Sequence, residues 1–112
     1  MRRDGHASEM DKIQGLREIL TAEPGNSFAR YGLAMELAKS GETAAALGEF
    51  DALLERDPGY TAGYFMAAQT LATAGRRDEA IVRLKNGIES ARRSGNSHAA
   101  GEMEEMLEGL AG

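Results

Sequence analysis

The chain has 112 residues, a formal net charge of −5 at pH 7 and no cysteine. Its 42% hydrophobic and 28% charged residues are ordinary for a folded globular protein, and its length suits a single domain. The acidic balance argues against a generic nucleic-acid surface, and the missing thiols exclude a disulfide framework or a cysteine-based site. No apolar run approaches the roughly 18 residues of a membrane span, so we expect no membrane association and a cytoplasmic protein.

The beginning of the chain predicts a short tail and then a helix. Residues 1–8 are polar and lack periodicity, which is typical of a flexible terminus. A stripe of apolar residues at helical spacing follows and predicts a first helix over residues 9–23, ended by Pro24. The stripe consists of Ile13, Leu16, Ile19 and Leu20.

The stretch after this helix contains two similar copies of one segment in succession. Pro24-Gly25 recurs as Pro58-Gly59, an offset of 34 residues, and 8 of the 34 aligned positions are identical. A fixed period of this length indicates a repeat architecture. We therefore predict one repeat over residues 27–60 and a second over residues 61–93, each made of two helices. The other identical pairs are Ala34/Ala68, Leu37/Leu71, Ala38/Ala72, Gly41/Gly75, Ala46/Ala80 and Glu55/Glu89.

The same offset relates the first helix to the later ones. Its apolar stripe aligns with Leu47, Phe50, Leu53 and Leu54, so it is a half-repeat equivalent to the second helix of each full repeat.

Glycines and hydroxyl residues predict where the repeat helices stop and start. Gly41 and Gly75 suit the left-handed position that ends a helix. Ser27, Thr61 and Ser97 are expected to cap helix N-termini.

The last segment predicts an amphipathic capping helix over residues 97–110. Apolar residues line one side of it, and glutamates line the other. Such a helix covers the apolar face that the last repeat would otherwise expose to water. The apolar side carries Ala99, Met103, Met106, Leu107 and Leu110, and the acidic side carries Glu102, Glu105 and Glu108.

With its turns and its small and large apolar positions, the duplicated segment resembles the tetratricopeptide repeat (TPR) family. The family pattern of Ala, three residues and Phe is met by Ala46 and Phe50, and the closing Pro by Pro58. Arg30 replaces the Trp of the pattern in the first copy, and Tyr64 takes that position in the second. Arg92 stands where a second closing Pro would be, which marks the end of the repeats.

The resemblance implies an all-α fold, a right-handed stack of antiparallel helix hairpins with about six helices. Residues 9–112 would form a single TPR-like domain.

The resemblance also implies a binding surface on the first helix of each repeat, because those helices line the concave face of the family's stack. Aromatic and thioether side chains there suit a groove for a peptide or an amphipathic helix. The alternative reading is that much of this strip is core, covered by neighbouring residues. The partner-binding residues predicted in this way are Phe28, Tyr31, Met35, Lys39, Phe65, Gln69 and Thr73, with Ala62 on the same side.

Nothing in the sequence predicts catalysis or a cofactor. No phosphate-binding glycine pattern occurs, and no nucleophile, base and oxyanion donor can be assembled. His6 and His98 lie far apart, and we expect neither to have a helical carboxylate or a second His at metal-ligand spacing, so no metal site is predicted.

The leading hypothesis is a non-catalytic adaptor that binds another protein through the concave face. An alternative is a structural homo-oligomer that self-associates through the same apolar strip. A third is that the basic segment 76–93 binds an acidic partner or nucleic acid, which the neighbouring glutamate-rich helix disfavours.

Overall fold

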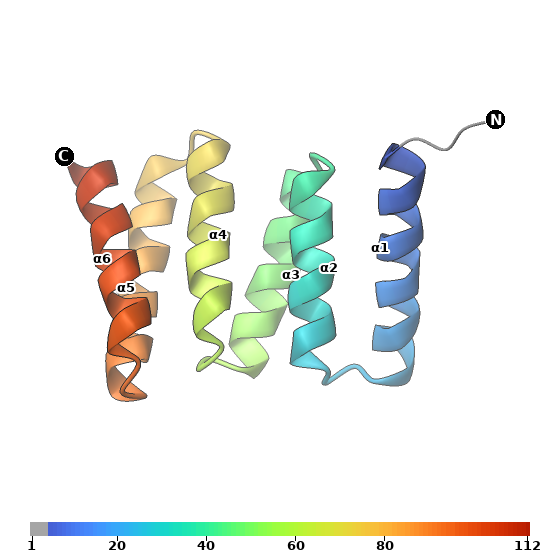
Figure 1. Cartoon of the computed structure of the whole chain (residues 1–112), viewed down its shortest axis with the longest axis horizontal. Coiled ribbons are helices and arrows are strands. Elements are labelled where there is room, and N and C mark those ends of the chain that lie inside the picture. Colours follow the sequence, from blue (N-terminus) through green and yellow to red (C-terminus); the bar gives the residue numbers. More distant parts are fainter. Residues whose placement is uncertain (1–4) are drawn as a thin grey trace. The chain divides into compact units, whose positions relative to one another are not determined.

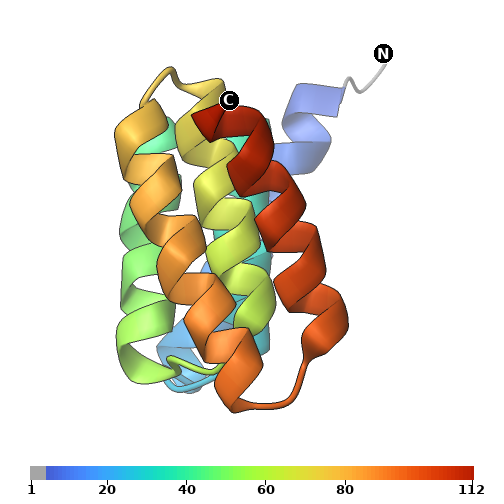
Figure 2. The same cartoon turned by 90° about the vertical axis from the view of Figure 1, so that its left-hand side faces the viewer.

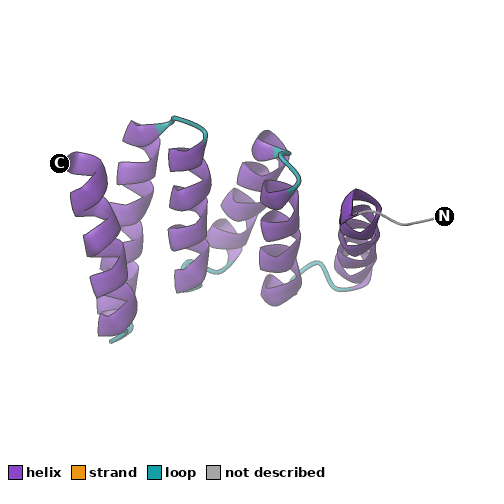
Figure 3. Ribbon diagram, turned by 45° about the horizontal axis from the view of Figure 1, so that its top comes forward, coloured by secondary structure: helices purple, strands orange, loops and turns teal. Residues whose placement is uncertain are grey.

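The computed structural model describes residues 5–112, with side chains from Met10 onward. Over these residues the chain is entirely α-helical apart from short connecting loops, as Figure 3 shows. The fold class is therefore the predicted all-α helical repeat. The six helices of the described chain are α1 (Gly5–Ala22), α2 (Ser27–Lys39), α3 (Thr43–Arg56), α4 (Thr61–Thr73), α5 (Arg77–Arg93) and α6 (Ser97–Ala111) (Figure 1).

The first helix starts earlier than the sequence predicted. α1 begins at Gly5, within the tail expected over residues 1–8. The part of that tail before Gly5 lies outside the described residues. The prediction placed the start at residue 9, four residues after Gly5, and helix ends are the least certain part of such a prediction.

The chain divides into two compact units, Met1–Arg56 and Asp57–Gly112. Each unit is described by itself, and a single domain over residues 9–112 stays a prediction. In the first unit α2 packs against both α1 and α3. Leu33 and Ala34 of α2 are buried, as are Ala46 and Phe50 of α3, so the hairpin core is built from the predicted small and large positions.

In the second unit α5 packs against α4 and α6, and Figure 2 brings α5 and α6 to the front. Ala68 of α4 and Ala80 and Leu84 of α5 are fully buried, as at the equivalent positions of the first hairpin. Small side chains at both Ala positions let the two backbones approach.

The tightest approach in the second unit is at Gly87 of α5. A methyl group added there would lie 2.6 Å from Tyr64 Cβ of α4 and 2.6 Å from Met103 Sδ of α6. Three helices therefore meet at a position that only glycine fills. This role of Gly87 was not predicted from the sequence.

The helix ends follow the predicted chemistry at the C-terminal side. Gly41, Gly75 and Gly95 have φ values of 84°, 80° and 76°, a conformation that side chains with a Cβ rarely adopt. Each comes directly after the residue that caps the C-terminus of a helix, so the prediction of Gly41 and Gly75 as helix-ending residues is confirmed.

The predicted N-terminal caps were wrong. Asn26 caps α2 by accepting a hydrogen bond from the Ala29 amide at 2.9 Å, and Asn96 caps α6 through the Ala99 amide at 3.1 Å. Ser27 and Ser97 are instead the first residues of those helices. Asparagine is as good a cap as serine, so the choice between adjacent polar residues cannot be made from residue type alone.

Thr61 does not cap α4 either. The cap position is Tyr60, which makes no capping bond through its side chain. The Thr61 hydroxyl donates to the Gly59 carbonyl at 3.3 Å and so stabilises the turn before the helix.

Candidate functional site

The predicted partner-binding residues of α2 lie on one face of that helix, at spacings of three and four residues. Phe28 at its start has 77% of its surface exposed, which is unusual for so large an apolar side chain. Tyr31 and Met35 are half-buried, and Lys39 is exposed. The face is therefore accessible, and its apolar character is strongest at the N-terminal end.

Tyr31 has a structural role as well as an exposed surface. Its ring lies edge-on against the ring of Phe50, with 6.4 Å between centroids and an interplanar angle of 66°. Phe50 is fully buried in α3. Part of the predicted strip is thus attached to the hairpin core, as the alternative reading of the sequence proposed.

Charged groups flank the C-terminal end of this face. Lys39 Nζ lies 3.8 Å from Glu36 Oε2, a loose pair on one helix. The other carboxylate oxygen, Glu36 Oε1, is buried and has no hydrogen-bond partner among the described residues.

The predicted residues of α4 occupy the equivalent face of that helix. Phe65 is half-buried, while Gln69, Thr73 and Ala62 are exposed. This face carries no charge, and its one aromatic residue is the counterpart of Tyr31 in the 34-residue period.

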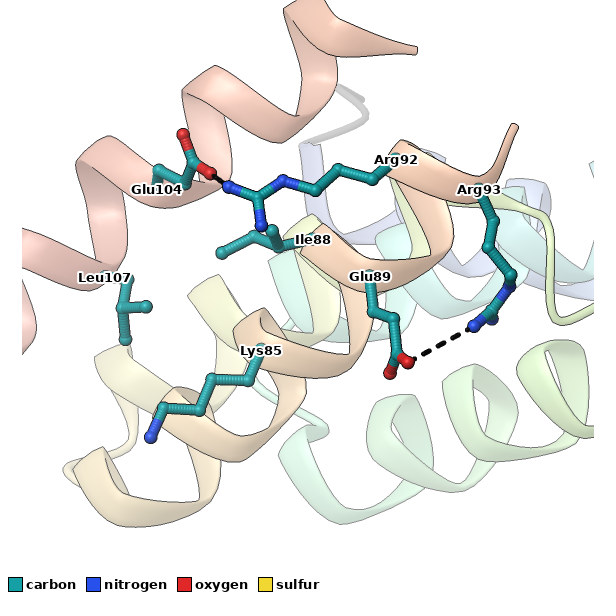
Figure 4. A pocket seen from close by; sticks show the side chains of 7 residues that line it. All are labelled: Lys85, Ile88, Glu89, Arg92, Arg93, Glu104 and Leu107. Atoms are coloured by element: carbon teal, nitrogen blue, oxygen red, sulfur yellow. Dashed lines mark hydrogen bonds and ion pairs between the residues drawn. The ribbon is translucent and has the colours of Figure 1, made fainter. Parts of the chain in front are cut away.

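The second unit also holds a groove that was not predicted from the sequence. It has a volume of about 560 Å³ and lies between α5 and α6. Figure 4 shows the apolar side chains of Ile88 and Leu107 among its lining residues, with Arg92 paired to Glu104. Arg93 Nη1 lies 3.4 Å from Glu89 Oε2. The seven lining residues are Lys85, Ile88, Glu89, Arg92, Arg93, Glu104 and Leu107.

The charges on α5 and α6 gave no sign of this groove in the sequence. Basic residues of α5 and glutamates of α6 read as two solvated faces, and only the fold brings Arg92 and Glu104 together. Leu107 was expected to be covered as part of the apolar stripe of the capping helix, yet it stays half-buried.

One expectation about His98 was wrong. Glu102 lies one helical turn further along α6, and its Oε2 is 3.4 Å from His98 Nε2. Over the residues that the structure describes, no group of three or more His, Cys, Asp or Glu side chains could hold a metal ion. No helix in this part of the chain is long and apolar enough to cross a membrane.

The helices, their 34-residue period and the accessible faces of α2 and α4 define a helical repeat protein. Residues 37–101, more than half of the chain, match the tetratricopeptide repeat, and the chain belongs to this family. A TPR repeat-containing protein of Pseudomonas aeruginosa is 28% identical over 98 residues, covering 88% of this chain and 93% of that protein.

Solved structures of TPR proteins have the same fold. A TPR domain protein from Salinibacter ruber is 32% identical, with a TM-score of 0.74 over 79% of this chain and 89% of that one. The TPR2B domain of yeast Sti1, solved in a complex with pHsp70, has a TM-score of 0.85 over 96% of this chain and 86% of that one. The latter is 16% identical, so its likeness concerns the fold alone.

Proposed function

We propose that the chain is a non-catalytic protein-interaction module that binds a peptide or an amphipathic helix of a partner protein through the faces of α2 and α4. The observation that carries this proposal is the exposure of Phe28, on the same helix face as Tyr31 and Met35. Large exposed aromatic side chains next to half-buried apolar ones are typical of residues that become buried on binding.

The composition of the two faces supports an amphipathic partner. The α2 face combines apolar side chains with the exposed Lys39. Apolar partner residues would cover Phe28 and Met35, and an acidic partner residue could pair with Lys39. Membership of the TPR family and the likeness to a domain solved with pHsp70 support binding of a protein segment in general terms.

The test uses a photo-crosslinking phenylalanine analogue at position 28. In the native lysate it is expected to label a partner, and mass spectrometry then identifies both the protein and the labelled segment. The matched control carries the analogue at Val82 of α5, which is 58% exposed but outside both predicted faces. Labelling from position 82 and not from position 28 would contradict the proposal.

Phe28→Ala gives an independent test. Because the side chain is mostly exposed, the fold should persist, while affinity for the identified partner should fall by about tenfold or more. Isothermal titration calorimetry measures the loss, and Val82→Ala is the control that should keep the affinity of the parent protein.

Self-association through the same strip is the alternative function. Tyr31 with its contact to Phe50 leaves less apolar surface for it than the sequence predicted. Under this alternative, Phe28→Asp would convert a concentration-dependent oligomer to a monomer.

A further inference from the structure

α4 is the one helix of the described chain that carries no charged residue. Its 13 residues contain no Asp, Glu, Lys or Arg, although 28% of the whole chain is charged. α2 has the same length and the equivalent place in the repeat, yet it carries Arg30, Glu36 and Lys39. Charged residues are depleted at the centre of protein interfaces, where the surface loses its water on binding. The surface of α4 is therefore suited to the centre of a binding site.

The exposed surface of α4 combines one aromatic ring with two uncharged polar groups. Gln69 and Thr73 are exposed, and Phe65 is half-buried. The three residues follow one another at a spacing of four, so they lie in a row along one side of the helix. Ala62, also exposed, is small and leaves room beside the ring of Phe65.

The polar groups of Gln69 and Thr73 are free for a partner. Neither side chain makes a hydrogen bond to another residue of the described chain. By contrast, the hydroxyl of Thr70 on the same helix donates to the Met66 carbonyl at 2.8 Å. A carboxamide and a hydroxyl can both donate and accept hydrogen bonds, so the row matches a partner that offers donors and acceptors without charge.

Given that a partner segment binds at the faces of α2 and α4, as proposed above, we infer that its part on α4 is extended and that Gln69 and Thr73 hydrogen-bond to its main chain. An extended segment presents unpaired N–H and C=O groups, which are strong and uncharged. A helix has paired these groups internally and meets α4 with side chains only. Apolar side chains of a docked helix would leave Gln69 and Thr73 buried without partners, which costs free energy.

The spacing of the row fits an extended chain. Gln69 and Thr73 are about 6 Å apart along the helix axis, since each residue rises about 1.5 Å. Two residues of an extended chain span about 6.7 Å, so the main-chain groups on one side of the partner repeat nearly in step with the row. Phe65 lies one step further and covers an apolar side chain of the partner. Main-chain bonds depend little on the partner's sequence, so Phe65 and the α2 face select that sequence.

The test begins with the photo-crosslinking phenylalanine analogue at position 65, and mass spectrometry identifies the labelled segment. A synthetic peptide of that segment is then made in versions that each carry one methylated main-chain amide. Isothermal titration calorimetry should show that methylation of the amide facing Gln69 weakens binding about fivefold or more. In Gln69→Met the same methylation should have no further effect, because the hydrogen bond is already lost.

Two variants of similar shape test the row itself. Gln69→Met and Thr73→Val remove a polar group each, and each should weaken binding of the unmethylated peptide about fivefold or more. The matched control is Asn86→Leu on α5, which is exposed and outside both faces, and which should keep the affinity of the parent protein. Circular dichroism confirms that each variant is folded.

The outcomes separate this inference from the proposed function. Labelling from position 28 but not from position 65, or full affinity in both Gln69→Met and Thr73→Val, would overturn the main-chain role and leave binding at α2 standing. A peptide that becomes helical on binding, or a labelled segment from a helix of a second copy, would also overturn it. Absence of labelling from both positions would overturn the proposed function as well.

Discussion

Arg30 and Tyr64 make the same hydrogen bond in two successive repeats. Arg30 Nη2 donates to the carbonyl oxygen of Pro24 at 3.0 Å, and the Tyr64 hydroxyl donates to that of Pro58 at 2.8 Å. The donors are 34 residues apart, as are the acceptors. A guanidinium and a phenol thus fix the turn before each repeat in the same way.

This equivalence explains why the family pattern tolerates Arg30 in place of Trp. Arg30 Nη1 also pairs with Glu49 Oε1 of α3 at 2.8 Å, which joins the two helices of the hairpin. In the second repeat the Ser90 hydroxyl of α5 donates to the Pro58 carbonyl at 2.9 Å, which joins α5 to the turn before α4.

The Pro58 carbonyl provides the first prediction. Tyr64→Phe and Ser90→Ala each remove one of its two donors, and each should lower the free energy of unfolding by about 1 kcal/mol. Urea unfolding followed by circular dichroism measures the loss. The double variant leaves the carbonyl without either donor and should lose at least the sum of the two; a double variant as stable as either single one would contradict a shared acceptor.

Gly87→Ala should destabilise the protein despite the better helix propensity of alanine. The added methyl group would overlap Tyr64 Cβ and Met103 Sδ, and overpacking of this kind costs roughly 1–3 kcal/mol. The matched control is Gly101→Ala in α6, where nothing lies within 4 Å of the added group. The control should be stabilised by up to about 1 kcal/mol. The midpoint of thermal unfolding should therefore fall in Gly87→Ala and rise in Gly101→Ala.

Substitutions at the start of α2 should show which of two adjacent polar residues caps this helix. Asn26→Ala should cost about 1 kcal/mol because it removes the bond to the Ala29 amide. Ser27→Ala, one position later, should cost much less, since Ser27 is inside the helix. Denaturant midpoints compare the stability of the two variants. An equal loss of stability would contradict Asn26 as the residue that caps α2.

The pKa of Glu79 should depend on Arg76. Hydrogen bonding from the Arg76 side chain holds the pKa of this exposed carboxyl below its ordinary value of 4.5, with Arg83 adding to the effect. A lowered folded pKa stabilises the fold above pH 4.5, and that contribution is lost as the pH falls through the lowered value. In Arg76→Gln an NMR titration should show the pKa of Glu79 rising toward 4.5, and an unchanged pKa would exclude Arg76 as its main cause.

Most of the fold was predictable because the repeat period can be read directly from the spacing of residues along the sequence. Pro24/Pro58 and Gly41/Gly75 mark the turns, and the buried alanines mark the hairpin crossings, all at one offset. Helix caps were harder to predict, because Asn26 and Ser27 are both good capping residues and only backbone geometry decides between them.

Site features were predictable only where they follow a single helix face. The spacing of Phe28, Tyr31 and Met35 predicts that they share a face. Whether a residue on that face also contacts the core depends on the second helix, as Tyr31 and Phe50 illustrate. The groove at Arg92 and Glu104 lies between two helices that carry ordinary surface charges, so no pattern within either helix predicts it.

The shared acceptor at Pro58 has a consequence for dissecting the chain. Pro58, Tyr64 and Ser90 all lie on the C-terminal side of Arg56, so a cut after that residue severs neither hydroxyl bond. The fragment 57–112 would keep both hydrogen bonds to the Pro58 carbonyl, which stabilise the turn before α4. Fragment complementation should therefore begin with a break at this peptide bond.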